Sequence, residues 1–162
     1  MPQHQDTLQR LLDRAAIEDV ITRYFHGIDR CDPGCVRNCF TEDICASYDG
    51  REEVKGIEPL MDSMNTFKRH KAGTVRITTH FMGNLNFCSL YENAAETETS
   101  AIAFLAMADE MGTILMRSLR YLDQLRRTSD GWRICERVHT LDWSCEMAAT
   151  FANTLATRRM SR

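Results

Sequence analysis

Residues 74–91, TVRITTHFMGNLNFCSLY, open the part of the chain that decides the fold. Threonine, valine, isoleucine and aromatic residues are frequent in this stretch, and such residues favour β-strands. Three further stretches of the same character follow, over residues 94–110, 112–128 and 131–143. The short turn signals YEN, EMG and SDG separate the four stretches, and strands joined by short turns pair antiparallel. The second half of the chain therefore predicts a long antiparallel meander.

The first half of the chain shows helical spacing instead. Over residues 8–30, apolar side chains recur mostly every three or four positions, which predicts an amphipathic helix. Pro33 and Gly34 are expected to end this helix. Three further elements are then expected before the meander begins: a short helix over 35–40, a strand over 43–50 and a helix over 56–70.

Helices followed by a long antiparallel sheet predict an α+β fold, in which the helices cover one face of the sheet. Strands of a dozen or more residues exceed the usual length and must bend, so the sheet is expected to curve. A curved sheet that the first helix closes at one end forms a cone with an apolar pocket, which suits a small molecule. We expect one domain over residues 1–162, with residues 144–162 forming a C-terminal helical tail.

Composition argues against several classes of protein. The formal net charge of −3 provides no broad attraction for nucleic acid or for an anionic membrane, so neither is expected as a partner. The chain lacks an apolar run of the roughly 18 residues that span a bilayer. Because its N-terminus is too polar for a secretory signal, the seven cysteines are expected to be reduced thiols in a cytoplasmic protein. The spacing of Cys31, Cys35 and Cys39 forms no zinc motif, and we expect neither a metal nor a cofactor.

One histidine, His80, interrupts the alternation of apolar residues in the first strand of the meander. Gly83 and Asn84 follow it and predict a kink in that strand. Asp29 stands near the end of the long helix, where the helix dipole disfavours a free carboxylate. A structural histidine and a surface aspartate would explain the two residues separately. The functional interpretation is a half-buried pair, because a sheet that wraps the helix would bring both side chains together inside the cone.

Four motifs stand along the chain in the order AAIEDVITRYFHGIDRCDPG (15–34), CFTED (39–43), THFMGN (79–84) and YLDQLRRTSDGWRICERV (121–138). Together they resemble the SnoaL-like branch of the nuclear-transport-factor-2-like (NTF2-like) superfamily. The resemblance extends from about Leu11 to Trp143 and implies the cone-shaped fold of that superfamily. The branch includes scytalone dehydratase, bile-acid 7α-dehydratase, γ-hexachlorocyclohexane dehydrochlorinase and polyketide cyclases.

The resemblance also implies site residues. In the dehydratase and dehydrochlorinase members, an aspartate near the end of the first helix pairs with a strand histidine, and Asp29 and His80 match these positions. Tyr24 matches a tyrosine of the bile-acid dehydratase type, and Arg137 resembles an arginine of the dehydrochlorinase type. Strand alternation puts His139 on the same face as Arg137, so either both face the pocket or neither does.

The implied chemistry is an elimination. A histidine can take a proton from carbon at neutral pH, while an aspartate fixes its tautomer and stabilises the cation that forms. We therefore predict a cofactor-independent lyase, of dehydratase or dehydrohalogenase type, that acts by His/Asp acid–base catalysis on a small hydrophobic cyclic or aromatic molecule. The expected catalytic residues are His80, Asp29 and Tyr24, and the expected substrate contacts are Arg137, His139, Met82 and Tyr48.

Two other functions use the same fold. One is a polyketide cyclase or an isomerase like ketosteroid isomerase, which would use the pocket with a different acid–base layout. The other is a non-catalytic small-molecule-binding or scaffold subunit, like the small subunit of a ring-hydroxylating dioxygenase. The presence of Tyr24, Asp29 and His80 favours the lyase, because a scaffold needs no buried acid–base pair.

The expected partners are a small hydrophobic substrate and further copies of the same chain. A long sheet with no second helical layer leaves one face uncovered, which predicts a homodimer or a homotrimer. The basic stretch FKRHK, residues 67–71, is interpreted as a solvated helix end rather than a phosphate site.

Overall fold

The computed structural model describes residues 2–110 and 112–148, with side chains from Asp6 onward. The described residues form four helices and six strands. These elements are α1 (Pro2–Asp29), α2 (Pro33–Arg37), β1 (Phe40–Tyr48), β2 (Val54–Lys55), α3 (Ile57–Ser63), α4 (Asn65–Lys71), β3 (Val75–Leu90), β4 (Ala94–Met107), β5 (Thr113–Thr128) and β6 (Gly131–Ala148). The order confirms the α+β class, with helices first and a long antiparallel meander last.

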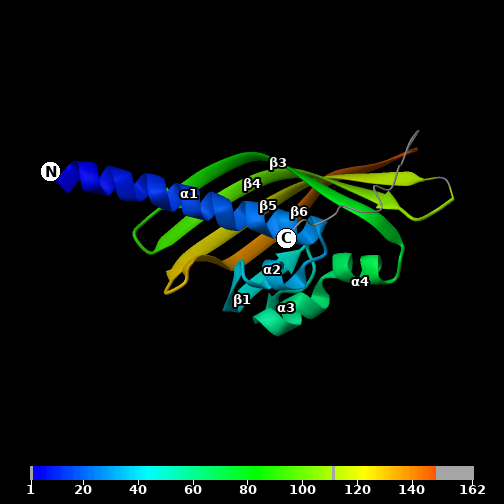
Figure 1. Ribbon diagram of the computed structural model, residues 1–162, viewed down its shortest axis with the longest axis horizontal. Coiled ribbons are helices and arrows are strands. Elements are labelled where there is room, and N and C mark those ends of the chain that lie inside the picture. Colours follow the sequence, from blue (N-terminus) through cyan, green and yellow to red (C-terminus); the bar gives the residue numbers. More distant parts are fainter. Residues whose placement is uncertain (1, 111, 149–162) are drawn as a thin grey trace, which may run out of the picture.

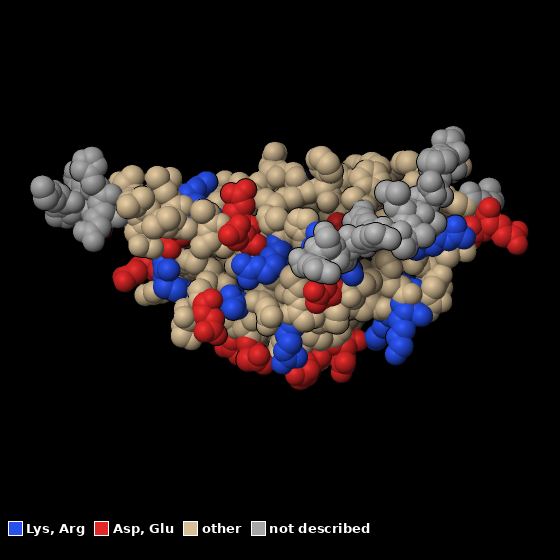
Figure 2. All heavy atoms as spheres, viewed as in Figure 1, with Lys and Arg blue, Asp and Glu red and all other residues tan. Residues whose placement is uncertain are grey.

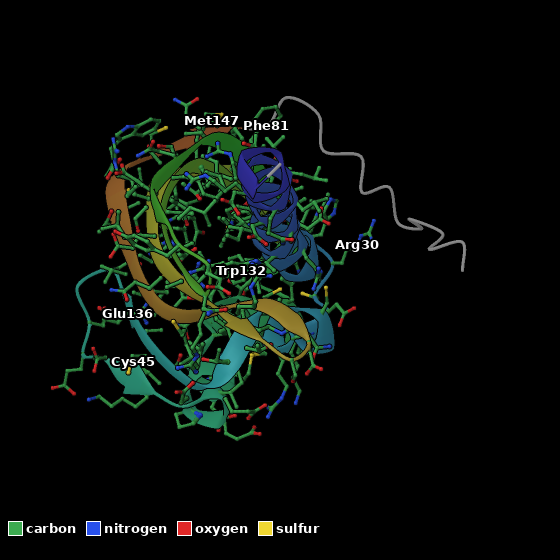
Figure 3. The ribbon with its side chains drawn as sticks, turned by 90° about the vertical axis from the view of Figure 1, so that its left-hand side faces the viewer. Arg30, Cys45, Phe81, Trp132, Glu136 and Met147 are labelled. Carbon is green, nitrogen blue, oxygen red and sulfur yellow. The ribbon has the colours of Figure 1, made fainter. Side chains whose placement is uncertain are left out.

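The six strands form one sheet in the order β2-β1-β6-β5-β4-β3. Strands β3 to β6 pair antiparallel with their neighbours, whereas β1 lies parallel to β6. Helix α1 crosses the concave side of the sheet, and α2, α3 and α4 gather at one end of it (Figure 1). Seen along the long axis, the sheet curls around the side chains of the core with α1 on its open side (Figure 3).

A bulge bends β3 where the sequence predicts a kink. The pairing of β3 with β4 shifts register between Met82 and Leu85, the interval that holds Gly83. A Cβ atom on Gly83 would lie 3.0 Å from the carbonyl oxygen of Ser100, so a larger residue here would push the two strands slightly apart. Bulges increase the local bend and twist of a strand, which curves the sheet toward α1.

The core lies between α1 and the concave face of the sheet. One face of α1 is buried there, through residues that follow helical spacing: Ile17, Val20, Ile21, Tyr24, Phe25 and Ile28. The earlier apolar residues Leu8, Leu11 and Leu12 stay exposed, because this end of α1 projects beyond the sheet (Figure 1). No helix among the described residues has both the length and the apolar character needed to cross a membrane.

Two expectations about local structure were wrong. The single helix expected over 56–70 is divided into α3 and α4 by Met64, whose extended backbone (φ −70°, ψ 97°) carries its side chain into the core. Residues 144–148, expected in a helical tail, instead extend β6, because each pairs with the first residues of β5. Pairing with a neighbouring strand outweighs local helix propensity here. The remainder of the expected tail, 149–162, lies outside the described residues.

The convex face of the sheet carries exposed apolar side chains. Phe81 and Trp143 on this face are 70% and 48% exposed, and Leu122 and Val138 lie beside each other on β5 and β6. Phe81 and Met147 lie outside the curved sheet, whereas Trp132 lies inside it (Figure 3). Charged side chains are sparse along the margin above β3 and gather over the helices (Figure 2). An exposed apolar patch of this kind favours self-association.

We therefore expect the protein to be a homodimer or homotrimer through the convex face. Light scattering coupled to size exclusion should give that mass at micromolar concentration. The double variant Phe81→Glu/Trp143→Glu should be monomeric, because it places charge in the apolar contact, and its circular dichroism should be unchanged. Tyr91→Glu, at an exposed strand connection, is the control and should keep the wild-type mass. A wild-type monomer would contradict the prediction.

Candidate active site

A cavity of about 310 Å³ lies inside the cone, between α1 and the concave face of the sheet. Strands β3 to β6, the segment after β1, and helices α3 and α4 supply the remaining walls. The buried part of the lining includes Tyr24, Thr78, Leu119 and Tyr121, whereas Asn65 and Arg69 on α4 are exposed and mark the mouth. This volume suits a small molecule.

Asp29 and His80 meet at the wall of this cavity. Nδ1 of His80 lies 2.7 Å from Oδ1 of Asp29, and the backbone N–H of His80 donates to Oδ2 at 2.9 Å. The side chain of His80 is 8% exposed, and that of Asp29 is 16% exposed. Because a carboxylate only accepts hydrogen bonds, the proton of the neutral ring is on Nδ1, and Nε2 is left as an acceptor. The ring of Phe25 packs against the imidazole with centroids 5.3 Å apart.

The local sequence explains why these two side chains reach each other. Asp29 is the last residue of α1, and its carboxylate projects from the helix end toward β3. A negative charge is unfavourable at a helix C-terminus, but two hydrogen bonds from His80 compensate for it. His80 and Met82 share the inward face of β3 by strand alternation.

Tyr24 and Tyr48 contribute hydroxyl groups to the cavity. The two hydroxyl oxygens lie 3.5 Å apart, and both residues line the cavity. Burial raises the pKa of Tyr24 well above its usual value, and the neighbouring Tyr48 adds to the effect. The Tyr24 hydroxyl therefore stays protonated, which leaves it able to donate a hydrogen bond.

Arg137 lies behind the cavity and does not line it. Its guanidinium makes two hydrogen bonds of 2.7 Å to the carboxylate of Asp123, and neither side chain is exposed. The guanidinium carbon also lies 4.0 Å from the ring centroid of Tyr24 and 4.8 Å from that of Tyr121. The structure therefore does not bring Arg137 to the cavity surface, and the rings of Tyr24 and Tyr121, which line the cavity, contact its guanidinium.

Met82 also lies outside the lining of the cavity. Its sulfur accepts a hydrogen bond of 3.8 Å from the Thr22 hydroxyl on α1, two turns before the helix end. The residue packs against the core and helps to seat the helix on β3.

His139 does line the cavity, on the inward face that it shares with Arg137. It is 5% exposed, and its ring packs against Tyr48 and Tyr121 with centroids 5.1 and 4.8 Å away. Nδ1 lies 3.0 Å from Oδ1 of Asp49, although the direction departs from hydrogen-bond geometry. Burial lowers the pKa of His139 to about 4, against the opposing effect of the Asp49 carboxylate. His139 is therefore a neutral hydrogen-bonding group at neutral pH.

The sequence analysis missed several residues of this site. Asp49, which stands at the end of the strand expected over 43–50, has a left-handed backbone (φ 55°) and accepts a 2.9 Å hydrogen bond from Arg117. Tyr121 and Asp123 were missed because their strand was read without assigning its faces. The sequence held a signal, because the apolar residues Leu119, Tyr121 and Leu125 occupy alternate positions and Asp123 falls on the same face. A carboxylate on such a buried face requires a cation on the neighbouring strand.

The described residues contain no group of three or more histidine, cysteine, aspartate or glutamate side chains that could hold a metal ion. Imidazole, carboxylate, phenol and guanidinium groups of the described residues line the cavity.

Comparison with known proteins gives the following matches. The model of the SnoaL-like domain matches residues 9–138. Uncharacterised proteins of Mycobacterium tuberculosis and Mycobacterium bovis are 25% identical over 136 residues, which cover 83% of this chain and 88% of each relative. Hexachlorocyclohexane dehydrochlorinase LinA-type3 from Novosphingobium barchaimii LL02 has a similar structure, with a TM-score of 0.76 and 18% identity over 91% of this chain and 99% of that chain. A candidate scytalone dehydratase from Novosphingobium aromaticivorans DSM 12444 also gives 0.76, at 19% identity, over 93% and 98% of the two chains. At such identities the two structures show a shared fold.

The lowered pKa of His139 makes thermal stability depend on pH. The unfolded chain binds a proton on this histidine below its ordinary value of 6.5, whereas the folded chain binds it only near pH 4. Unfolding therefore takes up a proton between these values, and stability falls as the pH falls through that window. His70, whose pKa is also lowered by burial, adds an effect of the same sign.

We expect the melting temperature of the wild type to fall between pH 7 and pH 5, and to fall less in His139→Gln. The matched control is His26→Gln, which replaces an exposed histidine on α1. Differential scanning calorimetry at several pH values measures the slopes. Equal slopes for the wild type and His139→Gln would show that His139 is not held neutral by the fold.

Proposed function

The chain belongs to the SnoaL-like domain family, and from that premise we propose that it is a cofactor-independent lyase of the dehydratase or dehydrohalogenase type. Its substrate is a small hydrophobic molecule, cyclic or aromatic, that loses water or a halide. The observation that carries this proposal is the contact between Asp29 and His80 at the wall of the cavity. The fold shared with a dehydrochlorinase supports the same general kind of reaction.

In the proposed reaction, Nε2 of His80 accepts a proton from a carbon next to the one that bears the leaving group. The electron pair of that C–H bond becomes the second bond of a carbon–carbon double bond. The bond to the leaving group breaks, and the leaving group takes its electron pair. A departing hydroxide then takes the proton from His80 and leaves as water, whereas with a halide the proton passes to solvent. Either route restores the neutral imidazole.

Asp29 has two tasks in this reaction. Its hydrogen bond to Nδ1 keeps the lone pair on Nε2, where the substrate carbon would lie. Its charge then stabilises the imidazolium that exists between the two proton transfers. An amide in its place would keep the shape but remove the charge.

Hydrogen-bond donors elsewhere in the lining complete the proposal. The hydroxyl groups of Tyr24 and Tyr48, together with His139, line the cavity and can hold a carbonyl or leaving-group oxygen as negative charge develops on it. Because burial raises the pKa of Tyr24, its hydroxyl donates a hydrogen bond without giving up its proton. The proton that converts a departing hydroxide to water is then the one that His80 has taken from the substrate carbon.

The same observation keeps an isomerase as a second candidate. A single histidine that takes a proton and returns it to a different carbon would move a double bond without eliminating anything. The scaffold alternative has less support, because it provides no reason to enclose a hydrogen-bonded histidine and carboxylate in a cavity. Product analysis separates the candidates, since only elimination releases water or halide.

We expect turnover to depend on His80 far more strongly than the thermal stability of the protein does. In a screen of aromatic and steroid-like alcohols and halides, His80→Ala should lower turnover by roughly 10²–10⁴-fold, the usual effect of removing a general base. Asp29→Asn should also cripple turnover, whereas Tyr24→Phe should have a smaller effect. His26→Ala is the matched control, because it removes an exposed histidine of α1.

Melting temperatures of the same variants test the structural alternative. If His80 serves only packing, His80→Ala should lower the melting temperature and leave turnover per folded molecule unchanged. Full activity in a stably folded His80→Ala protein would leave the proposed reaction without its base.

A further inference from the structure

Most of the charged side chains that line the cavity are basic. Arg51, Arg69 and Arg117 all line the cavity, whereas Asp49 is the one carboxylate among the described residues of the lining. His139 adds no charge at neutral pH, because burial lowers its pKa to about 4. The lining therefore carries an excess of positive charge, although the whole chain has a formal net charge of −3.

Most of this positive charge is already paired. Asp49 accepts a 2.9 Å hydrogen bond from Arg117, and the guanidinium of Arg51 lies 3.8 Å from the same carboxylate oxygen. Arg69 has no ion-pair partner among the described residues, although it lines the same cavity. Its guanidinium is the charge that a bound molecule could neutralise.

The position of Arg69 on α4 distinguishes it from its basic neighbours. Lys68, Arg69, His70 and Lys71 all occupy the last turn of α4, which explains them as favourable charges at a helix C-terminus. Arg69 alone among these four described residues lines the cavity. A solvated helix end therefore accounts for Lys68 and Lys71, but not for the guanidinium at the cavity mouth.

The geometry points to a substrate that carries a carboxylate, which Arg69 binds at the mouth of the cavity while the apolar part of the molecule lies inside. Arginine suits this task, because its planar guanidinium pairs with both oxygens of a carboxylate. Ile28, Ala103, Leu105 and Leu119 provide apolar walls beside His80 for a ring or short chain. The inference rests on the proposed function only for the reactive end, since the anion contact itself requires no chemistry.

A matched pair of probes tests the inference. Cinnamate has a carboxylate and a planar aromatic body, and cinnamamide has the same shape without the charge. At low ionic strength, calorimetric titration should show cinnamate binding to the wild type roughly tenfold more tightly than cinnamamide, as expected for one charged hydrogen-bonded contact. The preference should weaken as salt is added, because the site is exposed.

Variants of α4 then locate the contact. Arg69→Gln should abolish the preference for cinnamate, and Arg69→Lys should keep part of it. Lys71→Gln is the matched control, because it removes one positive charge from the same helix turn without touching the cavity. An equal loss in Lys71→Gln would show general electrostatic attraction and overturn the inference, as would equal affinities of the two probes for the wild type.

Failure of this inference can be told apart from failure of the proposed function. His80→Ala should keep the preference for cinnamate while it loses turnover. If neutral molecules undergo a His80-dependent elimination and cinnamate is not preferred, the carboxylate contact of Arg69 is wrong and the lyase proposal stands. If Arg69 gives a preference for cinnamate but turnover of no substrate depends on His80, the carboxylate contact stands and the lyase proposal is wrong.

Discussion

One contact, between the last residue of α1 and the edge strand β3, joins the helix to the sheet at the wall of the cavity. His80 lies on a strand that ends the sheet, so its backbone N–H has no further strand to pair with. Asp29 accepts a hydrogen bond from that N–H and another from the imidazole of the same residue. The helix end, the sheet edge and the orientation of the ring are therefore set by a single carboxylate. The bulge at Gly83 bends β3 just beyond this point, which keeps the sheet close to α1.

A second constraint lies behind the cavity. Arg137 and Asp123 form a fully buried ion pair on neighbouring strands, and the rings of Tyr24 and Tyr121 cover the guanidinium. Removing one member of such a pair typically costs about 3–5 kcal/mol, because the other is left buried and uncompensated. The pair also places a positive charge next to the Tyr24 ring, where it partly opposes the rise in that residue's pKa caused by burial. Arg137 therefore orders the wall that carries the hydroxyl donors without reaching the cavity itself.

The sequence predicted what depends on local pattern and missed what depends on distant pairing. Turn signals between β-rich stretches predicted the meander, and the placement of Asp29 at a helix end suggested its partner. Asp49 was missed as a site residue, because its ion-pair partner, Arg117, lies 68 residues further along the chain. Met64 divides a helix whose spacing looked continuous, since the core takes its side chain. Residues 144–148 have helical composition but pair with β5, a partner that local composition does not reveal.

The central claim is that Asp29 leaves His80 with a free lone pair on Nε2 inside the cavity. Nitrogen-15 NMR of histidine-labelled protein measures this directly, once the His80 signals are assigned by their loss in His80→Gln. In the neutral ring, we predict a proton on Nδ1 and none on Nε2, and we predict that Asp29→Asn disturbs this preference. A neutral His80 that carries its proton on Nε2 in the wild type would have no base to offer a substrate, and would contradict the account.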